Sequence, residues 1–177
     1  EFTGGESVPI HMYYQPSLGS YDIVSGLSWI NGNWLFATGI QIPLTKNKNE
    51  FAWSGFPEYP NPDYVRKYNR GHKLLRGTDF MLRAERNWRF TNWNFSLGLL
   101  PIWRITPDNG INPDTGERED LKGTTGMALS ALASFGYQFD VNNSIRFIHG
   151  HKLTDRDFNP DGLTRKTVNS ISYIYKF

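Results

Sequence analysis

The sequence predicts an all-β fold: an antiparallel up-and-down transmembrane β-barrel, either complete with about eight strands or part of a larger barrel. Three observations predict it. Apolar and polar residues alternate with a period of two, tight turns and long polar connections alternate along the chain, and Phe, Trp and Tyr make up 15% of the 177 residues. An aromatic-rich composition suits β-strands and the aromatic girdles of membrane barrels.

The first hairpin is predicted around a short turn signal. Residues 21–30 place large apolar side chains on one parity and mostly small or polar ones on the other. The Asn31-Gly32 pair that follows predicts a type I′ turn, because both residues tolerate the positive φ that this turn requires. With these two residues as the turn, Trp29 faces Trp34, and a large apolar face lies opposite a small, polar one.

The same construction predicts two more hairpins and a final strand. Their residues are 78–88 with 92–105, 126–139 with 144–153, and 168–177. A turn at residues 90–91 makes Trp88 face Trp93, and the third hairpin makes Tyr137 face Phe147. Each of these strands again has one largely apolar face.

The connections predict the orientation of the barrel. Turns within hairpins are short, whereas the connections between hairpins are long and polar: 45–77, 107–125 and 154–166. Bacterial outer-membrane barrels have tight periplasmic turns and long external loops. We therefore expect a location in the outer membrane of a Gram-negative bacterium, with the C-terminus at the periplasmic side.

The direction of the strands predicts at least one further strand before the first hairpin. We expect residues 1–177 to form one barrel domain, with 1–20 as an irregular lead-in. The first strand runs inward from the long-loop end, so at least one outward-running strand must precede Tyr21 in an even-numbered barrel. The segment 9–14 is a poor candidate because it is short and begins with proline. We favour the C-terminal part of a larger barrel over a minimal one.

The composition excludes several other classes of protein. No apolar run reaches the roughly 18 residues that a membrane-spanning helix needs, and the mean hydropathy of −0.52 suits a barrel with a polar lumen. The chain has no cysteine, which excludes disulfides and thiolate metal sites. A net charge of +2 is too small to indicate a nucleic-acid partner, and no cofactor is expected.

Two sequence features resemble those of outer-membrane proteins. Residues 172–177 (Ser-Tyr-Ile-Tyr-Lys-Phe) resemble the terminal signal of outer-membrane barrels, carried by Tyr173, Tyr175 and Phe177. This resemblance implies insertion by the barrel assembly machinery; the alternative is an edge strand that simply ends in phenylalanine. Residues 15–22 (Gln-Pro-Ser-Leu-Gly-Ser-Tyr-Asp) and 40–44 (Ile-Gln-Ile-Pro-Leu) are similar to segments of transporter barrels related to phenol-degradation-pathway and fatty-acid channels. That similarity implies transport without identifying a cargo.

Charged side chains on the polar parity are the candidate pore lining. They are Asp22, Arg83, Glu85, Arg104, Arg146 and Lys152, with Lys176 near the end of the chain. Two acids against five bases would attract anions into an open pore. The alternative is that these charges pair across strands and fill the barrel.

The longest connection, 45–77, is rich in aromatic residues and is expected to be an external loop. We expect it to fold over the barrel mouth as a lid that contacts the solute through Trp53, Phe56, Tyr59 and Tyr64. Packing of these rings against neighbouring loops is the alternative.

Two sequence patterns make metal binding or catalysis worth considering. Oxygen ligands spaced two apart, as in calcium loops, occur at Asp155, Asp157, Asn159 and Asp161. Turn chemistry alone also explains these residues. His149 and His151 share one strand face, and with Asp155 they are candidates for a metal site or a rim hydrolase, but no nucleophile motif supports an enzyme.

The sequence thus predicts a passive channel or transporter for small solutes, which the lid can gate, rather than an enzyme. Its expected partners are outer-membrane lipid, the barrel assembly machinery and a small-molecule solute. The alternative is a structural or interaction subunit, with protein partners in an envelope complex and no transport of its own.

Overall fold

The computed structural model describes residues 19–48, 71–112, 115–160 and 165–177. Every regular element in these ranges is a β-strand. The elements are β1 (Asp22–Asn31), β2 (Trp34–Pro43), β3 (Asp79–Arg89), β4 (Trp93–Arg104), β5 (Asn109–Ile111), β6 (Arg118–Asp120), β7 (Gly126–Gln138), β8 (Asn143–Thr154) and β9 (Thr167–Tyr175). Within these ranges the structure contains no helix with the length and hydropathy needed to cross a membrane.

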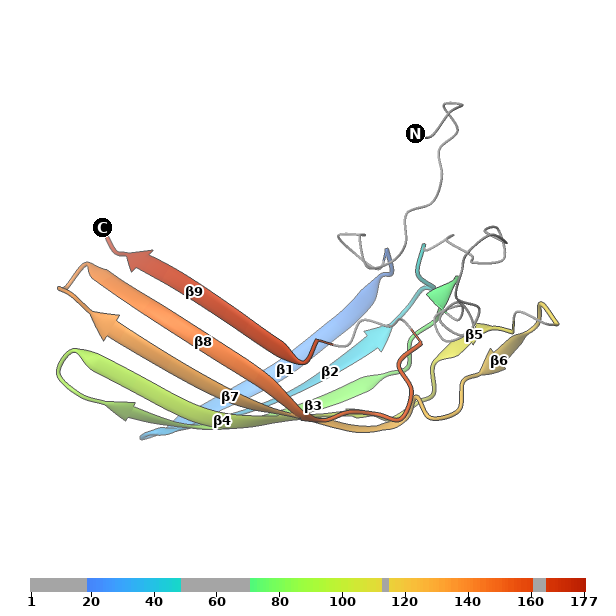
Figure 1. Cartoon of the computed structure of the whole chain (residues 1–177), viewed down its shortest axis with the longest axis horizontal. Coiled ribbons are helices and arrows are strands. Elements are labelled where there is room, and N and C mark those ends of the chain that lie inside the picture. Colours follow the sequence, from blue (N-terminus) through green and yellow to red (C-terminus); the bar gives the residue numbers. More distant parts are fainter. Residues whose placement is uncertain (1–18, 49–70, 113–114, 161–164) are drawn as a thin grey trace, which may run out of the picture.

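One antiparallel sheet of seven strands, in the order β1-β2-β3-β4-β7-β8-β9, makes up most of the structure. Figure 1 shows this sheet curled into a half-barrel, with the tight turns at one end and the long connections, including the β5-β6 hairpin, at the other. The all-β, antiparallel, up-and-down arrangement predicted from the sequence is confirmed. Short hairpin turns dictate it, because they can join only antiparallel neighbours.

The register of all three hairpins differs from the prediction by two residues. In the first hairpin, Trp29 pairs with Phe36 rather than with Trp34, and the turn residues are Gly32 and Asn33. Gly32 has a φ of 57° at the first turn position, as a type II′ turn requires, so Asn31 remains in β1.

The same correction applies to the other two hairpins. Trp88 pairs with Phe95 rather than with Trp93, and Tyr137 pairs with Ile145 rather than with Phe147. Because side chains alternate with a period of two, a shift of two residues changes the partner and leaves each side chain on its predicted face. The division into an apolar and a polar face is therefore unaffected.

The two faces of the sheet differ in chemistry. We call the face with the odd-numbered residues of β1, β4, β7, β8 and β9 and the even-numbered residues of β2 and β3 the outer face, and the opposite one the inner face. Large apolar side chains on the outer face stay uncovered: Leu27 is 79% exposed, and Leu97 and Leu99 are each 48% exposed. Among the described residues, no second layer packs against this face.

The inner face is crowded, which assigns it to the concave side of the curl. Its buried side chains are polar or charged and include Glu85, Ser96 and Ser134. A Cβ added at Gly98 would lie 2.8 Å from the carbonyl oxygen of Ala84, closer than a real Cβ approaches. Side chains converge on the concave side of a single curled sheet, so polar groups there shield one another without an apolar core.

The connection 107–125, which shows no strand periodicity, contains the β5-β6 hairpin. Leu75 bridges Asn109 of β5. The buried apolar side chains of Leu74, Leu121 and Pro160 all belong to the connections. The long-loop end is therefore packed and hydrogen-bonded rather than a set of solvated loops. The predicted strand candidate 9–14 and nearly all of the lead-in 1–20 lie outside the described residues.

Candidate functional site

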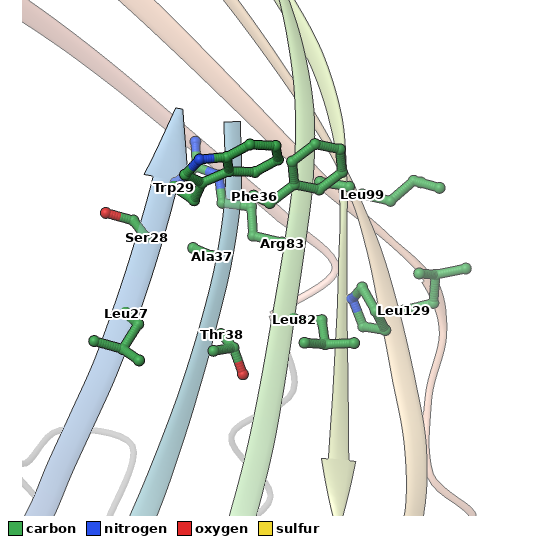
Figure 2. A pocket seen from close by; sticks show the side chains of 12 residues that line it. Leu27, Ser28, Trp29, Phe36, Ala37, Thr38, Leu82, Arg83, Leu99 and Leu129 are labelled. Atoms are coloured by element: carbon green, nitrogen blue, oxygen red, sulfur yellow. The ribbon is translucent and has the colours of Figure 1, made fainter. Parts of the chain in front are cut away.

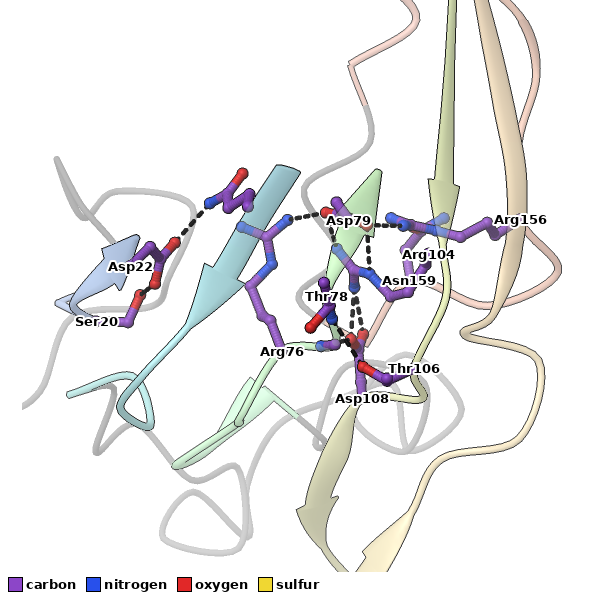
Figure 3. A network of polar contacts seen from close by, with 12 residues as sticks. Ser20, Asp22, Arg76, Thr78, Asp79, Arg104, Thr106, Asp108, Arg156 and Asn159 are labelled. Carbon is purple, nitrogen blue, oxygen red and sulfur yellow. Dashed lines mark hydrogen bonds and ion pairs between the residues drawn. The ribbon is translucent and has the colours of Figure 1, made fainter. Parts of the chain in front are cut away.

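The most highly organised polar site lies at the long-loop end of the inner face, around Arg104. Arg104 ends β4 directly opposite Asp79, the first residue of β3. Its Nε donates to Asp79 Oδ1 at 2.9 Å and its Nη2 to Oδ2 at 2.7 Å, while Nη1 donates to the two oxygens of Asp108 at 2.5 and 2.7 Å. One guanidinium thus joins two carboxylates, and all three residues are buried (Figure 3).

Two further arginines surround the same aspartate. Arg76 Nη2 lies 3.5 Å from Asp79 Oδ2, and Arg156 Nη1 lies 3.4 Å from Asp79 Oδ1. Arg156 also donates from Nη2 to Asn159 Oδ1 at 3.0 Å. We call Arg76, Asp79, Arg104, Asp108 and Arg156 the arginine cluster. It joins β3 and β4 to the connections that follow β4 and β8.

Asp108 anchors this cluster to the backbone of the connections. Its Oδ1 accepts a hydrogen bond from the N–H of Gly77 at 2.7 Å, and its own N–H donates to Thr124 Oγ1 at 3.0 Å. Thr124 in turn donates to the carbonyl of Leu121 at 2.7 Å. Burial raises the pKa of the Asp108 carboxyl above its usual range, although the Arg104 guanidinium opposes the shift.

All six side chains predicted to line a pore lie on the inner face, and most have local partners. Gln41 Nε2 donates to Asp22 Oδ2 at 2.5 Å. Arg83 pairs with Glu85, with 3.2 Å between Nε and Oε2. Arg104 pairs with Asp79 and Asp108, and Lys152 pairs with Asp155. Three of the predicted bases therefore have acidic partners.

Lys152 and Arg146 complete that set. Lys152 Nζ lies 2.8 Å from Asp155 Oδ2. Arg146 is exposed and forms no ion pair with any described residue. The positive field predicted from five bases and two acids is therefore largely neutralised by neighbours. Arg146 and Lys176 are the two predicted bases without an ion pair among the described residues.

The central part of the inner face carries neutral polar groups beside apolar side chains such as Ile148. Ser96 of β4 and Ser134 of β7 are cross-strand partners, and their hydroxyl oxygens lie 2.6 Å apart. Asn87 of β3 and Ser170 of β9 lie in the same cross-strand row. Such hydroxyl and amide groups suit contact with water or a polar solute.

The sequence prediction missed Asp79, Asp108, Arg76 and Arg156. The signal for Asp79 was present, since its parity places it on the polar face. The predicted register set Asp79 opposite Ile102, whereas the true register sets it opposite Arg104. No periodic signal could have located the other three, because they lie in connections.

The calcium and histidine candidates acquire other partners. Asp155 accepts one hydrogen bond from Lys152 Nζ and one from the N–H of Arg156, and Asn159 accepts one from the Arg156 side chain. Asp161 lies outside the described residues. Partial burial raises the pKa of the Asp155 carboxyl. Hydrogen bonds, above all the one from Lys152, outweigh that effect and hold this pKa below its usual range. In the described part of the chain, no three His, Asp or Glu side chains gather as a metal ion would require.

The histidine pair lies on the outer face of β8. The rings of His149 and His151 stack with centroids 6.3 Å apart, and His149 Nδ1 lies 2.7 Å from Asn169 Oδ1 of β9. The pair is therefore on the face opposite the arginine cluster and opposite Lys152.

The remaining predicted residues divide into two groups. The lid candidates Trp53, Phe56, Tyr59 and Tyr64 lie outside the described residues. In the terminal signal, Tyr173 and Tyr175 lie on the outer face of β9, where Tyr173 donates to Asn143 Oδ1. Phe177 follows the strand and contacts Tyr175 edge to face, with 5.8 Å between ring centroids.

No family model matches the chain, and no curated protein or solved structure matches it either. The fold itself defines the class: an all-β protein with an antiparallel, barrel-like sheet. The two faces of this sheet and the site at its long-loop end are the features that bear on function.

Proposed function

We propose that this chain is part of an outer-membrane barrel that lets small solutes cross the membrane passively. The observation that carries the proposal is the contrast between the faces: an outer face of exposed leucine and aromatic side chains, and an inner face whose buried side chains are polar. Apolar surface spread over a whole sheet needs a cover. Hydrocarbon supplies one in a barrel whose polar face looks into the lumen.

The outer face has a hollow suited to acyl chains. It crosses five strands, from β1 to β7, and Figure 2 shows its side chains from close by. Its apolar lining includes Leu27, Trp29, Phe36, Leu82, Leu99 and Leu129. A surface of this composition gains free energy when lipid tails replace water against it.

Aromatic rings gather at the tight-turn end of the outer face. Trp29 and Phe36 stack at 5.9 Å between centroids, and Trp93 lies 4.3 Å from Tyr137 by the same measure. Tryptophan and tyrosine favour the level of lipid headgroups because their rings are apolar and carry a polar edge. The rings therefore support a membrane boundary at the turn end, which we assign to the periplasmic side.

The channel mechanism follows from the inner face. A solute would pass along a lining of serine and asparagine groups with paired charges, so selectivity would arise mainly from pore width and residual charge. β1 and β9, the edge strands of the sheet, both run from the long-loop end to the turn end. A closed antiparallel barrel therefore needs an odd number of further strands between them.

Reconstitution of the purified protein into planar bilayers tests the proposal. Stepwise single-channel conductance is the expected result. A silent barrel that co-purifies with a stable protein partner would instead favour the structural or interaction subunit. Full solubility without detergent, with no partition into vesicles, would overturn the membrane assignment altogether.

A further inference from the structure

Arg86 is a charged side chain in an apolar setting. It lies near the turn end of β3 on the outer face, where it is exposed. It is the only Asp, Glu, Lys or Arg on the outer face of the seven strands of the described sheet. Its cross-strand partners are Trp34 of β2 and Leu97 of β4. A lone cation on this face needs a counter-charge.

Two tryptophans flank the guanidinium. The Cζ atom of Arg86 lies 5.4 Å from the ring centroid of Trp34 and 5.5 Å from that of Trp88. These are cation–π distances. No carboxylate of a described residue pairs with Arg86, in contrast to Arg83 and Arg104, which have acidic partners. The two rings orient the guanidinium but do not neutralise it.

The surroundings of Arg86 indicate the chemical class of the anion that it would bind. A guanidinium whose surroundings are aromatic keeps its N–H donors for an anion, and its planar donor geometry matches phosphate oxygens. The neighbouring outer face is apolar, so the anion should belong to a molecule with an apolar part. A phospholipid combines both.

The surface next to Arg86 fits the rest of such a molecule. Ala84, the next outer-face residue along β3 toward the long-loop end, lines the apolar hollow together with Phe36 and Leu99. The hollow thus begins in the cross-strand row next to the guanidinium, at Phe36 and Ala84, and extends to the row of Leu82, toward the long-loop end. A headgroup at Arg86 would place its acyl chains along the hollow, toward the middle of a membrane.

We propose that Arg86, held between Trp34 and Trp88, binds the phosphate group of a membrane phospholipid in the leaflet at the turn end. This rests on the proposed function, because it requires the outer face to meet lipid. The site would fix the depth of the sheet in the membrane, since headgroup phosphates lie at the interface while the leucines beyond remain in hydrocarbon.

The test uses the folded protein in an uncharged detergent, titrated with short-chain phosphatidylglycerol. Tryptophan fluorescence reports on the rings beside Arg86, and native mass spectrometry counts retained lipid. Arg86→Ala removes one interfacial cation and should weaken phosphatidylglycerol binding about fivefold. The matched control is Arg89→Ala, which removes an exposed cation from the inner face of the same strand end. It should change binding less than about twofold.

Further arms separate the sources of phosphate. A diacylglycerol of equal chain length should bind poorly, and Arg86→Lys should lie between the wild type and Arg86→Ala because lysine keeps charge without the planar fork. Equal loss in the Arg86 and Arg89 variants would overturn the proposal, and so would inorganic phosphate that binds as tightly as the lipid. Partition of every variant into uncharged vesicles is measured in parallel. Failure to partition refutes the proposed function, whereas partition without an Arg86 effect refutes only this inference.

Discussion

Arg104 and Asp79 are cross-strand partners at the long-loop end of β4 and β3, and their side chains meet through two parallel hydrogen bonds of 2.9 and 2.7 Å. This fork fixes the plane of the guanidinium, so its remaining Nη1 is held toward Asp108. A side chain of the sheet therefore determines where the following connection lies. Burying three charges is costly, and the close pairing offsets that cost only while every partner is present.

Substitution of Arg104 should be among the most damaging single changes in the described sheet. Arg104→Ala leaves the carboxylates of Asp79 and Asp108 buried without their main partner, which should lower the free energy of unfolding by about 3–5 kcal/mol. Urea unfolding followed by tryptophan fluorescence measures it. Arg89→Ala, at an exposed position, is the control and should cost under about 0.5 kcal/mol. Equal effects of the two substitutions would show that the cluster contributes no special stability.

The cluster should also make stability depend on pH through Asp108. Burial raises the pKa of this carboxyl in the folded protein above the unfolded value of 3.8. The folded state therefore binds the proton more tightly, so this contribution is fully present below pH 3.8 and is lost as the pH rises through the folded pKa. Asp108→Asn, which cannot ionise, should flatten that part of the profile in unfolding measurements from about pH 3 to 7. An unchanged profile would contradict the assignment.

Sequence periodicity was sufficient to predict the strands, their faces and the hairpins, but it did not determine the register. Strands, faces and hairpins follow from local alternation, and Arg86 could have been placed on the outer face by parity alone. Register depends on which residues of Asn31-Gly32-Asn33 form the turn, and the difference between type I′ and type II′ shifts every pair. A shift of the same size in the second hairpin, where the structure pairs Trp88 with Phe95, hid the pairing of Asp79 with Arg104.

The remainder of the site could not be predicted for a different reason. Asp108 and Arg156 reach the cluster from connections, whose paths are set by contacts such as the one between Gly77 and Asp108. No repeat in the sequence encodes such contacts. The sequence left open whether the inner-face charges pair with neighbours. In the structure most of them do, so an anion preference would rest on fewer residues than the sequence suggested.

If the protein forms an open pore, its selectivity should depend on Arg146. This inner-face cation is exposed and lacks an ion pair with any residue in the described ranges. One charge acting at about 7 Å in water is worth about 0.6 kcal/mol, so Arg146→Ala should lower the anion-to-cation permeability ratio about two- to threefold. The reversal potential across a salt gradient measures this ratio. Arg146→Lys keeps the charge and should preserve it, and cation preference in the unmodified protein would refute the idea.

The curl of the sheet should depend on glycines where strands approach closely on the inner face. A methyl group at Gly98 would lie 2.8 Å from the Ala84 carbonyl oxygen, a backbone atom that cannot move without distorting β3. Gly98→Ala should therefore lower the free energy of unfolding by about 1–3 kcal/mol, as overpacking does elsewhere. Gly39 is the matched control, because it lies on the same face in β2 and the nearest contacts of an added methyl are 3.4 Å away.

Gly39→Ala should be neutral or stabilising by under about 1 kcal/mol, since alanine restricts the unfolded chain more than glycine does. Thermal unfolding of both variants in the same detergent compares them directly. Similar losses would mean that glycine is needed on the inner face for backbone freedom in general. A loss confined to Gly98→Ala would identify close strand approach, and hence the crowded concave side, as the cause.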